Sequence, residues 1–217
     1  MKSMLVIGLG RFGRHLSMKL AELGNEVMVV DMDEERVERV APYVTSAHVA
    51  DCQKEDVLKE FGVSNFDICF VCVSGDFQSS LEITAMVKDL GAKWVVSKTD
   101  REKQGKFLEK IGADEIIHSE KEMAYRLARK YSAKSAFDYI ELSQDYAIIE
   151  VPTPKEWIGH SIRDLNVSSK LHINIIGYRN IDKKVIPVIN SDHMFDAAQH
   201  LIIAGLAKDI KHVESLL

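Results

Sequence analysis

The sequence is poor in cysteine, in proline and in long apolar runs. Only 3 cysteines and 4 prolines occur among 217 residues, which argues against a disulfide-rich secreted scaffold. The apolar runs, such as Met4–Ile7 and Val27–Val30, fall far short of the roughly 18 residues that a membrane-spanning helix needs. No signal peptide is evident. We therefore expect a cytoplasmic protein that reaches the inner face of the cell membrane only through a partner.

There is also no excess of positive charge. The 28 Lys and Arg residues are outnumbered by 33 Asp and Glu residues, which leaves a net charge of -5. A nucleic-acid-binding protein needs a basic patch, so we expect no nucleic-acid partner. The 8 histidines show no spacing that is typical of a metal site. The remaining composition, with 46% apolar and 28% charged residues, is that of an ordinary globular protein of one or two domains.

Cys69 and Cys72 form a C-x-x-C pair, which is also the spacing of redox and zinc sites. They lie in the apolar run DICFVCV, which is typical of a buried strand. Residues three apart on a strand point to opposite faces, and their Cα atoms are about 10 Å apart, too far for a disulfide. We therefore expect two core cysteines.

Short apolar runs alternate with helical segments over the first 132 residues. Strands are predicted at 4–8, 26–31, 46–51, 67–74, 94–98 and 114–119, with helices at 12–23, 34–43, 54–62, 77–91, 101–112 and 120–132. This alternation predicts an α/β fold, in which a doubly wound parallel sheet joined by right-handed crossovers is covered on both faces. Left-handed caps are expected at the glycines that follow four of these helices, Gly24, Gly62, Gly91 and Gly112.

The pattern changes near Ser132, where the small polar stretch 132–136 predicts a linker. We place the domain boundary between residues 134 and 135. Beyond it, a hairpin around Gln144 and Asp145 is predicted. The predicted elements are strands at 137–143, 146–152, 173–179, 184–189 and 200–205, and helices at 158–166 and 207–216. This small α+β domain has a thin core and is expected to need the larger domain or a second copy for support.

A glycine-rich fingerprint opens the chain. Gly8, Gly10 and Gly13 form G-x-G-x-x-G between the first predicted strand and helix. Gly8 permits the tight turn, Gly10 lets a pyrophosphate approach the backbone, and Gly13 lets the helix pack on the strand. Backbone N–H groups and the positive helix end would hold the phosphates. Asp31 ends the second strand, 18 positions past Gly13, where a carboxylate accepts from ribose hydroxyls and disfavours the 2′-phosphate of NADP.

Further candidates stand at the carboxyl ends of the predicted strands, where ligands of open α/β sheets bind. Arg11 lies between the glycines, where a guanidinium suits the terminal phosphate of ATP or ADP. A solvated surface arginine is the alternative. The other candidates are Phe12, Met32, Asp51, Cys52, Ser74, Gly75, Asp76 and Lys98. The polar residues at these strand ends have an equally ordinary interpretation as loop residues.

Four stretches, VIGLGRFG, VVDMDEERV, KFLEKIGADEIIHSEKEMA and IGHSIRDLNV, together resemble a known family. They are similar to the cytosolic RCK (KTN) regulatory subunits of Trk/Ktr-type potassium transport systems, over essentially the whole chain. The resemblance implies a Rossmann-like RCK N-terminal domain at 1–134 and a small α+β RCK-C (TrkA-C) domain at 135–217.

The resemblance also implies a gating ring that responds to a nucleotide. In relatives, homodimers assemble into an octameric ring beneath a membrane-embedded potassium-conducting subunit. ATP and ADP, or NAD and NADH in some members, favour different ring shapes. Carried over by position, Arg11 reaches the terminal phosphates, Asp31 binds the ribose, Asp51 and Cys52 lie near the adenine, and Lys98 lies near the phosphates.

Glu120 matches a glutamate that in Ktr-type relatives helps to bind a cation beside ATP at the dimer interface. From its position alone, Glu120 is an acid in the first turn of a helix, where the helix dipole favours it. Both interpretations stay open, and the first implies a divalent cation that accompanies ATP.

The C-terminal domain departs from the family pattern. Relatives often carry Gly-Asp before the last strand, where this chain has Ala198 and Gln199. Some relatives bind cyclic di-AMP between two such domains. Ile175, Arg179 and Pro187 are the candidates for such a cleft, and simple dimerisation is the alternative.

The alternative function is that of an NAD-dependent oxidoreductase. Hydride transfer needs a substrate pocket with an acid or base, and His160 and His172 have no evident orienting partner. A DNA-binding redox repressor would need a basic winged helix, which this acidic sequence does not show. We therefore expect a regulatory subunit and not an enzyme.

Overall fold

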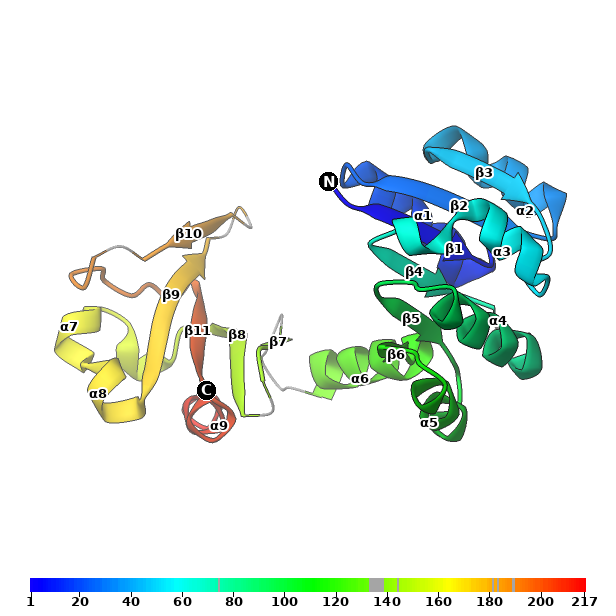
Figure 1. The fold of residues 1–217 in the computed structure, drawn as a ribbon. Helices are drawn as coiled ribbons and strands as arrows, with labels where there is room; N and C mark the ends of the chain where they lie inside the picture. Colours follow the sequence, from blue (N-terminus) through cyan, green and yellow to red (C-terminus); the bar gives the residue numbers. More distant parts are fainter. Residues whose placement is uncertain (74, 133–138, 144, 181, 183, 189) are drawn as a thin grey trace. The chain divides into compact units, whose positions relative to one another are not determined.

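The computed structural model describes residues 1–73, 75–132, 139–143, 145–180, 182, 184–188 and 190–217. The chain forms two compact units, Met1–Met123 and Ala124–Leu217 (Figure 1). Each unit has a hydrophobic core of its own. The predicted boundary between residues 134 and 135 lies outside the described residues.

The first unit contains a parallel six-stranded sheet. Its strands are β1 (Ser3–Ile7), β2 (Glu26–Asp31), β3 (Ser46–Val49), β4 (Ile68–Val71), β5 (Val95–Lys98) and β6 (Glu115–Ile117). They lie in the order β3-β2-β1-β4-β5-β6, and every neighbouring pair is parallel. The predicted doubly wound fold is confirmed. The strand order reverses between β1 and β4, and ligands of such sheets bind at the carboxyl ends beside this point.

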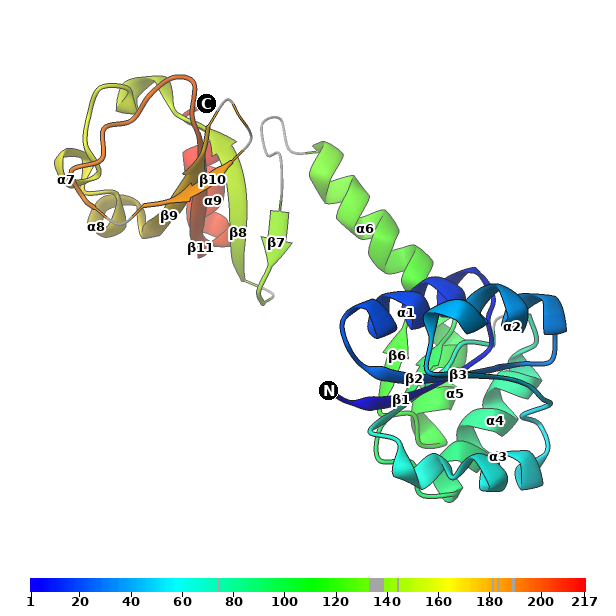
Figure 2. The same cartoon turned by 90° about the horizontal axis from the view of Figure 1, so that it is seen from above.

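Helices cover both faces of this sheet (Figure 2). The helices α1 (Arg11–Glu22) and α2 (Glu34–Val40) lie on one face, and α3 (Glu55–Phe61), α4 (Phe77–Asp89) and α5 (Glu102–Lys110) lie on the other. The helix α6 (Ser119–Ser132) follows β6. Successive side chains of β1 point to opposite faces of the sheet and so pack against both helix layers. Leu5 packs with residues of α3 and α4, whereas Val6 packs with residues of α1 and α2.

The six predicted strand–helix units are present, and their ends differ from the prediction by a few residues. Two short 3-10 helices, η1 (Ala41–Tyr43) and η2 (Val63–Asn65), were not predicted. Pro42 stands at the start of η1 and lacks the N–H that would continue α2. The expected left-handed caps are confirmed, with positive φ at Gly24, Gly62, Gly91 and Gly112.

Cys69 and Cys72 are buried on opposite faces of the sheet, as predicted. Cys69 belongs to the core beside α3 and α4, and Cys72 belongs to the core beside α1 and α2. Burial raises the pKa of each thiol to about 12. Both thiols therefore stay protonated near neutral pH, where a protonated thiol is a poor nucleophile and a poor metal ligand.

The second unit is an antiparallel five-stranded sheet with short helices. Its strands are β7 (Tyr139–Glu141), β8 (Tyr146–Pro152), β9 (Ile173–Arg179), β10 (Val185–Pro187) and β11 (His200–Leu206), in the order β10-β9-β11-β8-β7. The unit also includes α6 from Ala124 onward. Its other helices are η3 (Lys155–Trp157), α7 (Ile162–Leu165), α8 (Val167–Leu171) and α9 (Ala207–Glu214). Alternate residues of β8, such as Ile149 and Val151, share a core with Val213 of α9.

The second unit confirms the predicted α+β domain. The predicted hairpin is β7 paired with β8, and Gln144 at its turn lies outside the described residues. The helix predicted at 158–166 is shorter, because Ser161 and Asp164 form a capping box at its start and left-handed Asn166 ends it. The helix α8 was not predicted. Within the described residues, no helix combines the length and the apolarity needed to cross a membrane.

Candidate nucleotide-binding site

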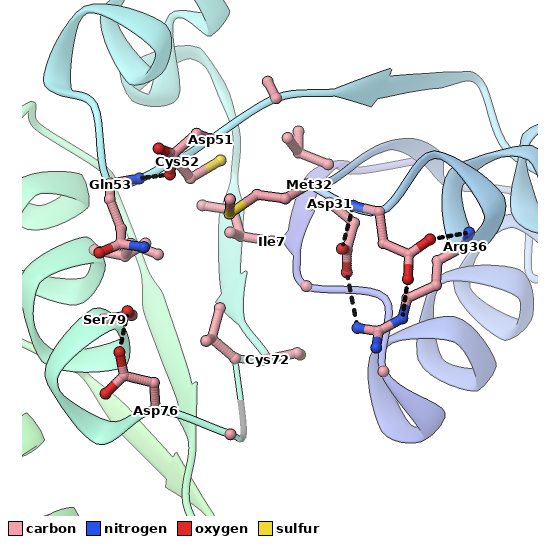
Figure 3. A pocket seen from close by; sticks show the side chains of 18 of the residues that line it. Ile7, Asp31, Met32, Arg36, Asp51, Cys52, Gln53, Cys72, Asp76 and Ser79 are labelled. Carbon is pink, nitrogen blue, oxygen red and sulfur yellow. Dashed lines mark hydrogen bonds and ion pairs between the residues drawn. The ribbon is translucent and has the colours of Figure 1, made fainter.

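A cavity of about 650 Å³ opens at the carboxyl ends of β1 to β4 (Figure 3). Its size falls in the range of roughly 300–1,000 Å³ that is usual for small-ligand pockets. The predicted residues that line it are Gly8, Gly10, Arg11, Asp31, Met32, Asp51, Cys52, Gly75 and Asp76. The topology therefore brings residues from four strand ends to one place.

The glycine turn borders this cavity at a point where side chains have no room. Gly8 has a φ of +94°, and its N–H donates to the carbonyl of Val30 at 2.8 Å. A Cβ atom on Gly8 would lie 3.0 Å from the carbonyl carbon of Cys72. A Cβ atom on Gly13 would lie 2.0 Å from the carbonyl oxygen of Gly8. Only glycine at both positions lets α1 and the end of β4 approach the turn this closely.

The carboxylate of Asp31 fixes the turn from the end of β2. Its Oδ2 accepts from the N–H of Leu9 at 2.5 Å, and its Oδ1 accepts from the N–H of Asp33 at 2.9 Å. The side chain is only 9% exposed. A carboxylate offers about four acceptor sites, so the two backbone bonds orient Asp31 and leave capacity for ribose hydroxyls.

Arg36 borders the same end of the cavity and was missed by the sequence analysis. Its Nη1 lies 3.7 Å from Oδ2 of Asp31, and its Nε lies 3.1 Å from Oδ2 of Asp33. Asp33 also caps α2, since its side chain accepts from the N–H of Arg36 at 3.2 Å. One guanidinium is therefore shared by two carboxylates at the expected ribose end.

The end of β3 supplies Asp51, Cys52 and Gln53 to the cavity (Figure 3). Oδ1 of Asp51 accepts from the N–H of Gln53 at 3.0 Å. Burial, together with the carboxylates of Asp51 and Asp31, raises the pKa of Cys52 to about 12. The Cys52 thiol is therefore a small apolar wall of the cavity, whereas the Gln53 amide can both donate and accept.

The start of α4 supplies Gly75, Asp76 and Ser79. Asp76 caps the helix, accepting from the Ser79 hydroxyl at 2.6 Å and from the N–H of Gln78 at 3.0 Å. These bonds, that of Ser79 first, hold the pKa of Asp76 below its usual value. Asp76 therefore stays ionised beside the cavity near neutral pH. The candidate Ser74 lies outside the described residues.

Three of the predicted nucleotide-binding residues do not line the cavity. Phe12 packs into the core beside α1, and Gly13 lies beneath the turn. Lys98 is only 5% exposed, and its Nζ lies 2.5 Å from Oδ1 of Asp100 and 3.5 Å from Oε2 of Glu120. The charge of Lys98 acts on the thiol of Cys72, a residue of the cavity wall, and opposes the rise in its pKa.

Glu120 lies at the start of α6 and is 65% exposed. Its Oε2 accepts from the Ser119 hydroxyl at 2.8 Å. This bond first, with the Lys98 ammonium adding to it, lowers the pKa of Glu120 to about 2. In the part of the chain that the structure describes, no three His, Cys, Asp or Glu side chains are grouped so as to hold a metal ion.

Arg36, Gln53 and Ser79 were missed although each has a signal in the sequence. Gln53 directly follows two predicted residues, and Ser79 lies one helical turn past Asp76. Arg36 lies in the first turn of α2, the helix that follows β2. Extending the search from each strand end through the first turn of the next helix would have found all three.

The comparisons with known proteins agree with the fold. The TrkA-N domain model matches residues 4–119, and the TrkA-C domain model matches residues 146–217. The Ktr system potassium uptake protein C of Bacillus subtilis (strain 168) is 35% identical over 213 residues, 98% of this chain and 96% of that protein. This chain belongs to the Ktr family of potassium uptake proteins. Ktr system potassium uptake protein A of the same organism is 35% identical over 214 residues, 99% of this chain and 96% of that protein.

Solved structures share the fold of this Ktr family member. Structures of the GsuK channel, one of them bound to NAD, match with TM-scores of 0.67 and 0.64 at 16% identity. The matches cover 99% of this chain, which spans only 39% of the GsuK chains. At this identity the likeness shows a shared fold alone. The family assignment made from the sequence motifs is confirmed by the family models and the Ktr relatives.

Proposed function

We propose that this Ktr family member is the cytoplasmic, nucleotide-binding regulatory subunit of a potassium uptake system. The observation that carries the proposal is a cavity that joins the glycine turn, Arg11 and Asp31 at the carboxyl ends of the sheet. The turn offers N–H donors to phosphates, Asp31 offers acceptors to ribose hydroxyls, and Arg11 offers a guanidinium to a terminal phosphate. A ribonucleotide with a chain of phosphates offers a partner to all three.

ATP and ADP are the proposed ligands. Arg11 is exposed at the cavity rim in the first turn of α1, where it can follow the phosphate chain outward. A guanidinium binds a terminal phosphate bidentately, whereas NAD ends in nicotinamide and offers no such group. NAD and NADH are the alternative ligands, because the GsuK channel, which shares the fold, has been solved bound to NAD.

The cavity chemistry favours binding over turnover. No histidine, tyrosine or lysine is among the described residues that line it, and these are the usual proton donors and acceptors in hydride transfer. The thiol of Cys52 is kept protonated by its raised pKa. We therefore propose a regulator and not an oxidoreductase.

Glu120 is proposed to ligate a divalent cation beside the terminal phosphate. Mg²⁺ and Ca²⁺ need six or more oxygen ligands, so one exposed carboxylate is not enough. The remaining ligands would come from phosphate oxygens, water and a second copy of the chain. This arrangement fits a homodimer within an octameric ring that acts on a membrane-embedded, Trk/Ktr-type potassium transport subunit.

Regulation by such a ring requires the nucleotide to bind two ring shapes with different affinities. A contact to the γ-phosphate that forms in only one ring shape supplies this difference for ATP, and ADP lacks the γ-phosphate. Arg11 is proposed to make that contact. A coupling of about 1–3 kcal/mol is typical of allosteric proteins, and one charge-assisted hydrogen bond to phosphate is of this size.

The second unit contains Arg179, a candidate residue for binding a different ligand. Arg179 was a candidate for cyclic di-AMP, and its Nε lies 2.8 Å from Oε2 of the buried Glu150. An anionic ligand at Arg179 would have to exchange with, or add to, this carboxylate. Cyclic di-AMP therefore belongs in the binding panel as a ligand whose site is distinct from the glycine turn.

The first experiment is calorimetry with a thermal-shift panel on the purified chain. The ligands are ATP, ADP, AMP, NAD, NADH and cyclic di-AMP, each with and without Mg²⁺ or Ca²⁺. We expect ATP and ADP to raise the unfolding midpoint most, and a divalent ion to tighten ATP. Dominance of NAD or NADH would shift the proposal to a redox-responsive regulator. No response to any nucleotide would overturn it.

Regulation is tested by potassium uptake. A strain that lacks its own uptake systems would express a Ktr membrane subunit with or without this chain. We expect growth at low potassium to require the chain, to fail with Asp31→Ala, and to survive with Glu156→Ala, which changes an exposed residue of η3. Growth that is independent of the chain would contradict a regulatory role.

A further inference from the structure

The ribose end of the cavity carries both signs of charge. Asp31, Asp33 and Arg36 all line it, and Figure 3 shows Arg36 beside Asp31. A carboxylate at this place is the usual receptor for a free 2′-hydroxyl, whereas a nearby arginine is the usual receptor for a 2′-phosphate. The two side chains taken singly therefore favour opposite classes of nucleotide.

Asp33 decides between them by holding the guanidinium. Nε of Arg36 lies 3.1 Å from Oδ2 of Asp33, closer than the 3.7 Å between Nη1 and Oδ2 of Asp31. The two carboxylates outnumber the one guanidinium, so the group keeps a net charge of -1. The Arg36 side chain is 50% exposed at the cavity rim, so the surrounding protein does not fix its position by burial. The ion pair with Asp33 therefore sets how far the guanidinium lies from a ligand.

We propose that Asp31, Asp33 and Arg36 act as one ionic group, of net charge -1, that selects adenosine nucleotides with an unphosphorylated 2′-hydroxyl. Asp33 is the positioning residue, because it withholds Arg36 from a 2′-phosphate. Asp31 receives the ribose hydroxyls and repels a phosphate placed there. The inference rests on the proposed function, in which an adenosine nucleotide binds this cavity.

The variant Asp33→Asn separates these roles. Asparagine caps a helix as well as aspartate does, so the start of α2 is preserved. The substitution removes the nearer partner of Arg36 and changes the net charge of the group from -1 to 0. Arg36 is then available to a 2′-phosphate, and Asp31 still receives a free ribose.

The test compares two ligands that differ only in the 2′-phosphate, AMP and adenosine 2′,5′-bisphosphate. Calorimetry gives the ratio of their Kd values for the wild type, Asp33→Asn, Arg36→Gln and the double variant. We expect the ratio to shift toward the bisphosphate roughly fivefold in Asp33→Asn, the size of one partly exposed ion pair. The gain disappears in the double variant, because it depends on Arg36.

Glu35→Gln is the matched control. It removes one negative charge from the same helix, but Glu35 pairs with Arg39 and does not line the cavity. We expect its ratio to stay at the wild-type value. An equal gain in Glu35→Gln, or a gain that persists in the double variant, would mean a general charge effect and would overturn the proposal.

Binding of ADP and AMP to the wild type separates a failure of the selectivity group from a failure of the proposed nucleotide site. Wild-type protein that binds ADP and AMP, with a ratio unchanged in Asp33→Asn, overturns the selectivity group alone. Wild-type protein that binds neither ADP nor AMP overturns the proposed nucleotide site and the selectivity group together. Circular dichroism and urea unfolding of Asp33→Asn, both expected to match the wild type, check that the overall fold and its stability are kept.

Discussion

The carboxylate of Asp31 accepts a hydrogen bond from the N–H of Leu9 at 2.5 Å, which joins the end of β2 to the turn that follows β1. The same carboxylate lines the cavity. Asp31 therefore serves the fold and the proposed ligand with different lone pairs of one group. Stability and ligand binding are expected to fall together when it is removed.

Asp31→Ala is expected to lose about 1–3 kcal/mol of unfolding free energy, because the N–H groups of Leu9 and Asp33 lose their acceptor. The substitution should also weaken the binding of ATP, ADP and AMP equally, since all three nucleotides carry the ribose. Urea unfolding and calorimetry measure the two effects. Glu22→Ala, which breaks only the exposed pair with Lys19, is the control. Unchanged affinities would remove Asp31 from the site.

Gly13→Ala is expected to destabilise the first unit by about 3 kcal/mol, because the new Cβ would overlap the carbonyl oxygen of Gly8. At an unhindered helix position the same change would stabilise by about 1 kcal/mol. Gly75→Ala is the control, since a Cβ there meets nothing within 4 Å. Unfolding in guanidinium chloride measures the free energy of unfolding of both variants. Equal stability of the two would contradict the close approach of α1 to the turn.

Arg11→Ala is expected to weaken the binding of ATP roughly tenfold and to change the binding of ADP and AMP much less. The reason is that one charge-assisted hydrogen bond to the terminal phosphate of ATP is lost. Calorimetry at constant ionic strength gives the three Kd values. Arg14→Ala removes the same charge from the next turn of α1, at a residue that does not line the cavity. Equal weakening of all three nucleotides would show that Arg11 acts by general attraction.

Ser119→Ala is expected to raise the pKa of Glu120 from about 2 toward its usual 4.5, because the Ser119 hydroxyl is the main cause of the depression. A depressed carboxyl pKa stabilises the fold above pH 4.5, and this stabilisation is lost as the pH falls toward 2. The effect is small, because the carboxylate is largely exposed. Titration of the Glu120 carboxyl carbon by NMR measures it, and an unchanged pKa would contradict the assigned cause.

Glu150→Ala is expected to destabilise the second unit by about 2 kcal/mol, because the buried carboxylate is paired with the half-buried side chains of Arg179 and His200. Trp157 lies in that core, and Trp94→Phe leaves it as the single tryptophan. Its fluorescence then follows the second unit. Glu156→Ala, at an exposed position, should stay within about 0.5 kcal/mol of the wild type.

Much of the first unit follows from local pattern. Apolar runs such as Val27–Val30 predict strands that are buried on both faces, and glycines after helices predict left-handed caps, because each signal depends on a few adjacent residues. The helix α8 escaped prediction because its start and end are left-handed residues, Asn166 and His172, that are not glycine. Such conformations are held by the surrounding structure and leave little trace in the sequence.

The site was predictable where it lies on strand ends and unpredictable where it depends on helices. Asp31, Asp51 and Asp76 line the cavity because the carboxyl ends of parallel strands meet at one edge of the sheet. Arg36 and Ser79 lie on helices, and the face that each helix turns to the cavity is set by how the helix packs on the sheet.

The sequence by itself determined the order of strands and helices, the two-unit organisation and the glycine turn, because these depend on local conformational preference and on alternating burial. Only the tertiary structure decided which charges meet. Asp33 holds Arg36 beside Asp31, and Glu150 meets Arg179 across β11. Packing and strand register decide such pairs, because they bring together side chains whose separation along the chain carries no signal of contact.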